Sequence, residues 1–169
     1  MTDSTIELTA ADAMQVVVNT VSPSLSVPEL EQELLRAKVS GFPVVDNLDL
    51  VGVVSRGDII RTICDEREVA KHTSDFYFDE TGFHESEMES LRDIADRVGE
   101  RLESMTVCDV MASKPRTVRS DQKLSEVANL LVDNRIHRLP VVEDRALVGI
   151  VTTIDLVRLI GQRKLRSHH

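Results

Sequence analysis

The stretch PVVDNLDLVGVVSRGD, residues 43–58, decides the fold because it recurs as PVVEDRALVGIVTTID at residues 140–155. At this offset of 97 positions, residues 9–63 align with residues 106–160 without a gap, and 17 of the 55 aligned positions are identical. Repetition over that length indicates duplication of one structural unit. A unit of this size buries too little surface to be comfortably stable alone, so we expect the two copies to share one core.

Both copies predict the same order of elements, β-α-β-β-α, after a short leading helix. In the first copy, apolar residues at helical spacing run from Val27 to Leu34, and Ser26 with Glu29 is typical of a capping box. The runs FPVVD and LVGVV, separated by a polar turn, predict a β-hairpin. Gly52 lies inside the second strand, where a missing side chain often marks the close approach of a ligand or another backbone. We therefore predict an α/β fold of the α+β kind, built from two repeats.

Residues 64–105 form an insert that has no counterpart in the duplication. Apolar residues at steps of three and four predict an amphipathic helix over 86–104. The insert also holds four of the five aromatic residues, which are Phe76, Tyr77, Phe78 and Phe83. Because apolar helical stripes are normally buried, we expect the helix to cover the repeats with the aromatic residues beneath it. A lid or a dimer contact is the alternative.

The composition of the chain argues against several classes of protein. A net charge of −9 disfavours a nucleic-acid binder, whose affinity depends on cationic contacts to phosphates. Cys64 and Cys108 lack the spacing of a zinc site or disulfide framework, so we predict two free thiols. No export signal is seen, and no stretch approaches the ~20 apolar residues of a membrane helix. We expect a cytoplasmic protein, and the closing RSHH, residues 166–169, is typical of the start of an expression tag.

The repeated pattern h-P-V-V-x4-L-V-G-h-V-[ST]-x-x-D resembles a tandem pair of cystathionine β-synthase (CBS) domains, a Bateman module. The resemblance covers both repeats, and the layout is similar to that of small stand-alone CBS proteins of bacteria and plant organelles. It implies two repeats paired about a pseudo-twofold axis, with clefts between them in which many members bind adenine nucleotides or related adenosyl ligands. It also implies a homodimer formed through helices, and regulation of an unidentified partner protein rather than catalysis.

Two short motifs, Ser55-x-x-Asp58 and Thr152-x-x-Asp155, have the chemistry of a ribose site. Each is predicted where a strand meets a helix N-terminus, and the free backbone N–H groups there favour anions. A carboxylate can accept two hydrogen bonds from the vicinal hydroxyls of a ribose, and the resemblance implies this role for both Asp residues. The same spacing is also that of a helix cap, and this alternative stays open.

Basic residues near these motifs are the candidates for phosphate binding. His137 and Arg138 precede the PVVE strand, and the planar guanidinium of an Arg suits phosphate because its hydrogen bonds are charge-assisted and often bidentate. The resemblance implies phosphate contacts for both, with Ser55 and Thr152 near the ribose or the phosphate. The first repeat has Ser40 and Gly41 instead, so Arg56 is its nearest cation.

The resemblance implies that further residues line the adenine and ribose pocket: Thr20, Val21, Pro43, Thr117, Val118 and Pro140. Ordinary strand residues are the alternative for the Thr and Val positions, since both types suit strands. The sequence carries no glycine-rich phosphate loop with Lys, no G-x-S-x-G and no H-E-x-x-H, so we predict neither catalytic residues nor a metal.

We therefore predict a non-catalytic regulatory or energy-sensing module that binds AMP, ADP or ATP as a regulatory ligand and requires no cofactor. The first alternative is a ligand-free scaffold that docks a partner protein through the aromatic residues and helix of the insert. A nucleotide-processing enzyme and a nucleic-acid binder are weaker alternatives.

Overall fold

The computed structural model describes residues 7–66 and 91–162, including the backbone but not the side chains of residues 91–95. The aromatic residues of the insert, the first residues of its predicted helix and the closing RSHH lie outside the described residues. The described chain divides into two compact units. Among the described residues, unit 1 holds 7–20, Val45–Val51 and 114–162, and unit 2 holds Val21–Val44, 52–66 and 91–113.

Unit 2 contains most of the first repeat. Helix α2 (Val27–Ala37) begins at the predicted capping box of Ser26 and Glu29, and it buries Val27, Leu30 and Leu34. Strands β1 (Gly41–Asp46) and β2 (Asp49–Ser55) follow, and a helix then begins whose described part covers residues 56–66. Helices α4 (Leu91–Glu103) and α5 (Val107–Val110) complete the unit.

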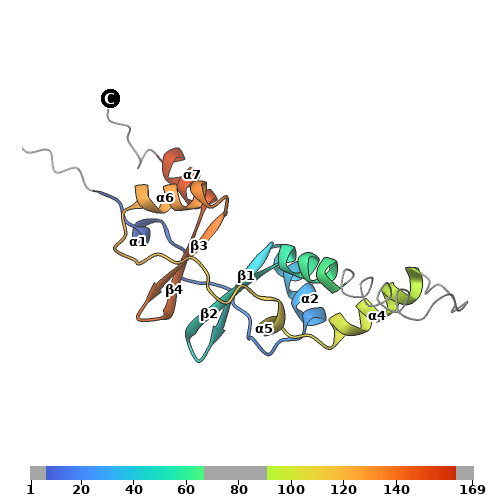
Figure 1. Ribbon diagram of the computed structural model, residues 1–169. Helices are drawn as coiled ribbons and strands as arrows, with labels where there is room; N and C mark the ends of the chain where they lie inside the picture. Colours follow the sequence, from blue (N-terminus) through green and yellow to red (C-terminus); the bar gives the residue numbers. More distant parts are fainter. Residues whose placement is uncertain (1–6, 67–90, 163–169) are drawn as a thin grey trace, which may run out of the picture. The chain divides into compact units, whose positions relative to one another are not determined.

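Unit 1 contains most of the second repeat. Helix α6 (Leu124–Asp133), strands β3 (Arg138–Glu143) and β4 (Ala146–Thr152) and helix α7 (Thr153–Gly161) follow the order of the first repeat. Helices α6 and α7 pack on the β3–β4 hairpin together with α1 (Ala10–Ala13), as Figure 1 shows. The core is apolar and consists of Ala10, Val118, Leu124, Val127, Leu131, Leu139, Val141, Val151 and Leu159.

The strands pair in the order β1-β2-β4-β3, as an antiparallel four-stranded sheet. The link between β2 and β4 is the pair Asp49 and Ala146, and both residues belong to unit 1. The predicted extended segments each contribute one parallel bridge, Val21 to Val44 and Val118 to Val141. The predicted α/β class with two hairpin-and-helix repeats is confirmed.

The leading segment of each repeat packs in the unit that holds the body of the other repeat. In unit 1, the Ala10 N–H donates to the Gln122 carbonyl at 2.8 Å, and Gln15 forms an antiparallel bridge with Ile150 of β4. The two repeats thus exchange their leading segments, which the duplicated sequence does not reveal. A leading helix alone is too short to be stable, so it forms only where the other repeat buries it.

Unit 2 shows the matching arrangement at positions related by the same offset. The Val107 N–H donates to the Leu25 carbonyl at 2.8 Å, and Ala112 forms an antiparallel bridge with Val53 of β2. The side chain of Val107 is fully buried, as Ala10 is in unit 1. Each unit is therefore built from segments that are distant in the sequence.

The predicted insert helix is present as α4, and it packs against α2 in unit 2. Its Val98 side chain is 7% exposed, so the helix turns this position of its apolar stripe inward. Both cysteines are exposed and unpaired. No helix in the described part of the chain is both long and apolar enough to cross a bilayer.

Candidate functional site

The Asp155 carboxylate lies at the first turn of α7, where β4 ends. Its Oδ2 accepts hydrogen bonds from the backbone N–H and the hydroxyl of Thr152, at 2.9 and 2.6 Å. The Thr152 hydroxyl in turn accepts from the Asp155 N–H at 3.3 Å, which completes a capping box. Asp155 is only 2% exposed, so the fold places a carboxylate in its interior.

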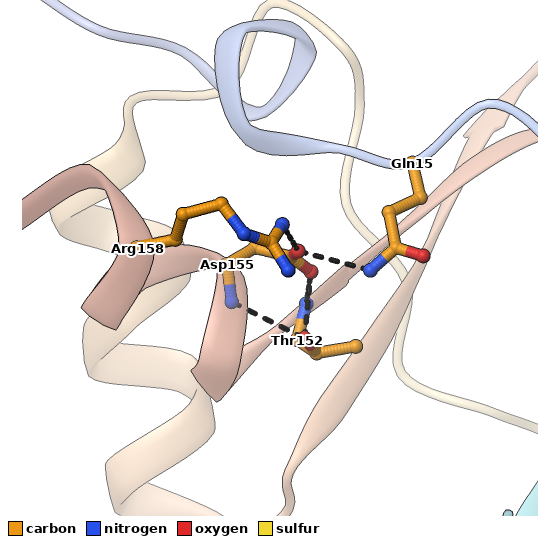
Figure 2. A network of polar contacts seen from close by, with 4 residues as sticks. All are labelled: Gln15, Thr152, Asp155 and Arg158. Atoms are coloured by element: carbon orange, nitrogen blue, oxygen red, sulfur yellow. Dashed lines mark hydrogen bonds and ion pairs between the residues drawn. The ribbon is translucent and has the colours of Figure 1, made fainter. Parts of the chain in front are cut away.

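The other oxygen of Asp155 is bonded by two further side chains, which Figure 2 shows converging on it. Gln15 Nε2 donates to Asp155 Oδ1 at 2.9 Å, and Arg158 Nη1 donates to the same oxygen at 2.8 Å. Burial alone would raise the pKa of Asp155, but the hydrogen bonds from Thr152, Gln15 and Arg158 outweigh it and lower the pKa below its usual value. Asp155 is therefore held as a carboxylate.

The first repeat has the same arrangement around Asp58, which is 9% exposed. Asp58 Oδ2 accepts from the backbone N–H and the hydroxyl of Ser55, at 2.8 and 2.7 Å. Its Oδ1 accepts from Arg61 Nη1 at 2.9 Å. Both predicted motifs are thus helix caps, as the alternative interpretation required, and each also buries a carboxyl group at a strand–helix junction.

The two carboxylates differ in how many of their acceptor positions are used. A carboxylate has about four lone-pair positions. Each oxygen of Asp155 accepts two hydrogen bonds within the described chain, whereas Asp58 Oδ1 accepts only the one from Arg61 there. The position equivalent to Gln15 in the second leading segment is Ala112, which has no donor in its side chain.

The predicted phosphate-binding residues lie at the same junctions. His137 is exposed and its carbonyl accepts from the Thr153 N–H at 3.0 Å, which ties it to the start of α7. Arg138 is the first residue of β3 and is half-buried, and burial lowers the pKa of its guanidinium. Arg138 pairs with Thr152 across the β3–β4 hairpin, so it is close to the Asp155 cap.

The first repeat has no such cation because of its local packing. Gly41 occupies the position of Arg138, and a Cβ there would come within 2.6 Å of the Val54 carbonyl oxygen. Arg56 is exposed, and its guanidinium donates to the Leu34 carbonyl at 3.4 Å.

The residues predicted for the adenine pocket meet in backbone pairs. The Val21 N–H donates to the Pro43 carbonyl at 3.1 Å, and the Val118 N–H donates to the Pro140 carbonyl at 3.0 Å. The four residues of these pairs are buried, whereas Thr20 is exposed and Thr117 is half-buried. Each pair joins an extended segment to the first strand of a hairpin, β1 in the first repeat and β3 in the second.

Sequence reasoning missed three residues of the polar network, Gln15, Arg61 and Arg158. Both Arg residues stand three positions after the motif Asp and are identical between the repeats, so the duplication carried a signal for them. No signal in the sequence pointed to Gln15, because this residue reaches Asp155 only through the exchange of leading segments. Within the described ranges 7–66 and 91–162, no group of three or more His, Cys, Asp or Glu side chains is placed to hold a metal ion.

Comparison with known proteins identifies the class to which this fold and these caps belong. The CBS domain model matches residues 10–65 and 107–162. The chain belongs to the CBS domain family and is a tandem pair of these domains.

Among its relatives is CBSX2, a chloroplastic CBS domain-containing protein of Arabidopsis thaliana, which is 35% identical over 155 residues, or 90% of this chain and 62% of CBSX2. The related chloroplastic CBSX1 is 30% identical over 87% of this chain and 61% of its own length. The chain thus spans about three fifths of these two relatives. An inosine-5'-monophosphate dehydrogenase of Korarchaeum cryptofilum matches over only 21% of its length, at 29% identity.

The same likeness extends to solved structures. A crystal structure of CBSX2 in complex with AMP superposes with a TM-score of 0.66 at 32% sequence identity, covering 93% of this chain and 98% of that one.

Proposed function

We propose that the chain is a non-catalytic regulatory module that binds an adenosine-containing ligand of the AMP, ADP or ATP type. One observation carries the proposal: the CBSX2 structure contains AMP, and the present chain matches nearly all of it at 32% identity. The two buried carboxyl groups at strand–helix junctions supply acceptors for ribose hydroxyls.

In this proposal, Asp58 and Asp155 accept hydrogen bonds from ribose hydroxyls. Ser55 and Thr152 hold these carboxylates in place, since each donates to its Asp from both backbone and hydroxyl. His137 and Arg138 bind phosphate at the second cap, with Arg56 as the nearest cation at the first. Thr20, Val21 and Pro43, with Thr117, Val118 and Pro140, line the pockets for adenine and ribose.

A bound nucleotide stabilises whichever arrangement of the chain binds it better. A regulated partner protein then responds to the population of that arrangement, so the cellular level of the nucleotide becomes the signal. A cytoplasmic location remains a prediction from the sequence, as does the absence of a nucleic-acid or membrane partner.

Thermal shift and calorimetry with AMP, ADP and ATP test the proposal. Asp58→Ala and Asp155→Ala should abolish or weaken binding by about 10- to 100-fold, since a hydrogen bond to a charged group contributes roughly 1.5–3 kcal/mol. The matched control is Asp109→Ala, which removes the same kind of cap at α5, where Asp109 accepts from Thr106 at 2.8 and 2.9 Å.

Asp58→Ala and Asp109→Ala should lose about 1 kcal/mol of stability as helix caps. Asp155→Ala should lose about 1.5–3 kcal/mol, because Gln15 and Arg158 also donate to this carboxylate. Only the two at the proposed sites should also lose the ligand-induced shift. No shift with any nucleotide in the unmodified chain would favour the ligand-free scaffold instead, and conversion of ATP or ADP by the pure protein would indicate an enzyme.

We propose in addition that two copies of the chain associate through helices. Leu35 of α2 and Ile60 of the following helix are exposed, and so are Val132 and Val157 at the equivalent positions in unit 1. Apolar residues repeated at matching positions of two repeats suit contact with a second copy, which presents the same residues. Sedimentation velocity should show a dimer for the unmodified chain and a monomer for a Val132→Lys, Val157→Lys double variant.

A further inference from the structure

The Gln15 side chain is hydrogen-bonded to the Asp155 carboxylate, which binds ribose in the proposed function. Its Nε2 lies 2.9 Å from Asp155 Oδ1, and Arg158 already donates to that oxygen at 2.8 Å. The two remaining acceptor positions, on Oδ2, are used by Thr152. A ribose hydroxyl can therefore bond to Asp155 only after one of these donors has left.

Gln15 is the donor that is easiest to displace. Thr152 belongs to the cap itself, and Arg158 forms an ion pair with Asp155 at 2.8 Å, whereas the Gln15 amide is neutral and makes the weaker hydrogen bond. Gln15 is an exposed residue on the leading segment, and its backbone is held by hydrogen bonds with Ile150 at 2.9 and 3.0 Å. The backbone can stay paired while the side-chain amide swings into solvent.

The first repeat lacks this donor. Ala112 makes the equivalent pair of backbone hydrogen bonds with Val53, at 3.1 and 2.9 Å, so its Cβ stands where that of Gln15 stands in the other unit. Asp58 Oδ1 accepts from Arg61 alone among the described residues, and one acceptor position on it is open. The two caps are alike except for this one side chain.

We propose that Gln15 is an internal competitor for ribose at Asp155, which makes the two adenosyl sites unequal. The Asp58 carboxylate accepts a hydrogen bond from one hydroxyl of the ribose diol at its open Oδ1 position, whereas the Asp155 carboxylate does so only by displacing the Gln15 amide. Gln15 is thus a positioning residue that sets the affinity of one site and, through it, the ligand concentration at which the second site fills. This inference rests on the proposed function.

Titration calorimetry with adenosine tests it, because adenosine carries the diol without any phosphate. In an Asp58→Ala background only the Asp155 site remains, and adding Gln15→Met removes the donor while keeping most of the side-chain volume. We expect adenosine to bind about 3- to 10-fold more tightly there, the range of one net hydrogen bond. The matched experiment is Ala112→Gln in an Asp155→Ala background, which should weaken adenosine binding at Asp58 by a similar factor.

A probe without the diol separates competition for Asp155 from a change in the space around it. The affinity for 2',3'-dideoxyadenosine should be unchanged by Gln15→Met. Unchanged adenosine affinity in that variant, or equal tightening for the dideoxy probe, would overturn the inference while leaving the proposed function intact.

If the unmodified chain binds neither adenosine nor AMP, the proposed function fails and the inference fails with it. Thermal unfolding of each variant without ligand shows that it is folded, and Gln15→Leu replaces Gln15→Met if the methionine variant is destabilised.

Discussion

Met14 lies so close to Gly149 that a Cβ at position 149 would come within 2.6 Å of the Met14 sulfur. The same relationship joins Met111 to Gly52, again at 2.6 Å. These glycines were expected to mark a close approach by a ligand or another backbone. The approach at each is made by the leading segment of the other repeat, through a Met side chain and a backbone carbonyl at 3.0–3.1 Å.

Gly149→Ala should therefore destabilise the protein. Methionine is flexible and its sulfur can move, but the Gln15 carbonyl at 3.1 Å is held by the bridge to β4, so we expect a loss of about 1–3 kcal/mol. Urea unfolding of the variant and of the unmodified protein measures this loss in the free energy of unfolding. Gly161→Ala is the control, because nothing lies within 4 Å of a Cβ there, and it should be neutral or stabilising. Equal destabilisation by both variants would contradict the close approach.

Asp155→Asn should destabilise the protein at neutral pH and cost progressively less in acid. The pKa of Asp155 is lowered from its usual 3.8 in the folded chain, so the ionised group stabilises the fold above that value. This stabilisation is lost as the pH falls through the lower folded pKa. We expect a difference of about 1.5–3 kcal/mol at pH 7, since three side chains donate to the charge.

Chemical unfolding of both proteins between pH 7 and pH 2 measures that difference. Asp133→Asn, at the exposed end of α6, is the control for removal of one negative charge from an acidic chain. A difference between the Asp155 variant and the unmodified protein that stays constant with pH would contradict the prediction.

Leu48→Gly should stabilise the protein. The turn between β1 and β2 has φ of 48° at Asn47 and 76° at Leu48, as in a type I′ hairpin turn, which favours Gly at the second position. Leu48 is 78% exposed, so its side chain contributes little packing. We expect a gain of roughly 0.5–1 kcal/mol in thermal or urea unfolding. Leu48→Ala keeps the unfavourable φ, and a gain of the same size in that variant would show that the turn geometry is not the cause.

Arg138→Gln should weaken AMP binding without affecting adenosine binding. Arg138 is paired with Thr152 across the hairpin, close to the Asp155 cap, and of the two ligands only AMP carries a phosphate that the guanidinium can bind. A loss of about 10-fold or more for AMP is expected from the removal of one charge-assisted contact. Calorimetry with AMP and with adenosine measures the ratio of the two affinities in each protein. An equal loss for adenosine would indicate a structural role for Arg138.

Fragments cut at the repeat boundaries should not fold by themselves. Residues 106–162 lack the leading segment, which contributes the buried Ala10 to the core of unit 1 and pairs Gln15 with β4. Residues 1–65 lack α5 and Ala112, which belong to unit 2. Circular dichroism should show little structure in either fragment and a gain of structure on mixing. Cooperative unfolding of an isolated fragment would contradict this.

Most of the fold could be predicted from the sequence because its signals are local. The capping box at Ser26, the hairpins and the helix of the insert follow from the spacing of apolar and turn residues within each copy. The exchange of leading segments could not be predicted. The two leading segments have similar patterns, so either could pack on either repeat, and only long-range backbone pairing decides between them.

In the candidate site, likewise, the local caps could be predicted from the sequence and the long-range contact could not. Ser55, Asp58, Thr152 and Asp155 stand at fixed spacing on one element, and the structure forms the caps that this spacing requires. Whether these caps also bind ribose depends on a ligand and stays a prediction. Gln15 could not be found, because it is brought to Asp155 from 140 positions away.

The exchanged segments also constrain how the chain is made. Gln15 leaves the ribosome long before its partner Asp155, and at about 5–20 residues per second the delay is roughly 10–30 s. During that interval the leading segment of the first repeat has no partner to pack against, so unit 1 cannot complete its folding. Such long-range pairing slows folding, so newly made chains expose apolar surface that chaperones recognise.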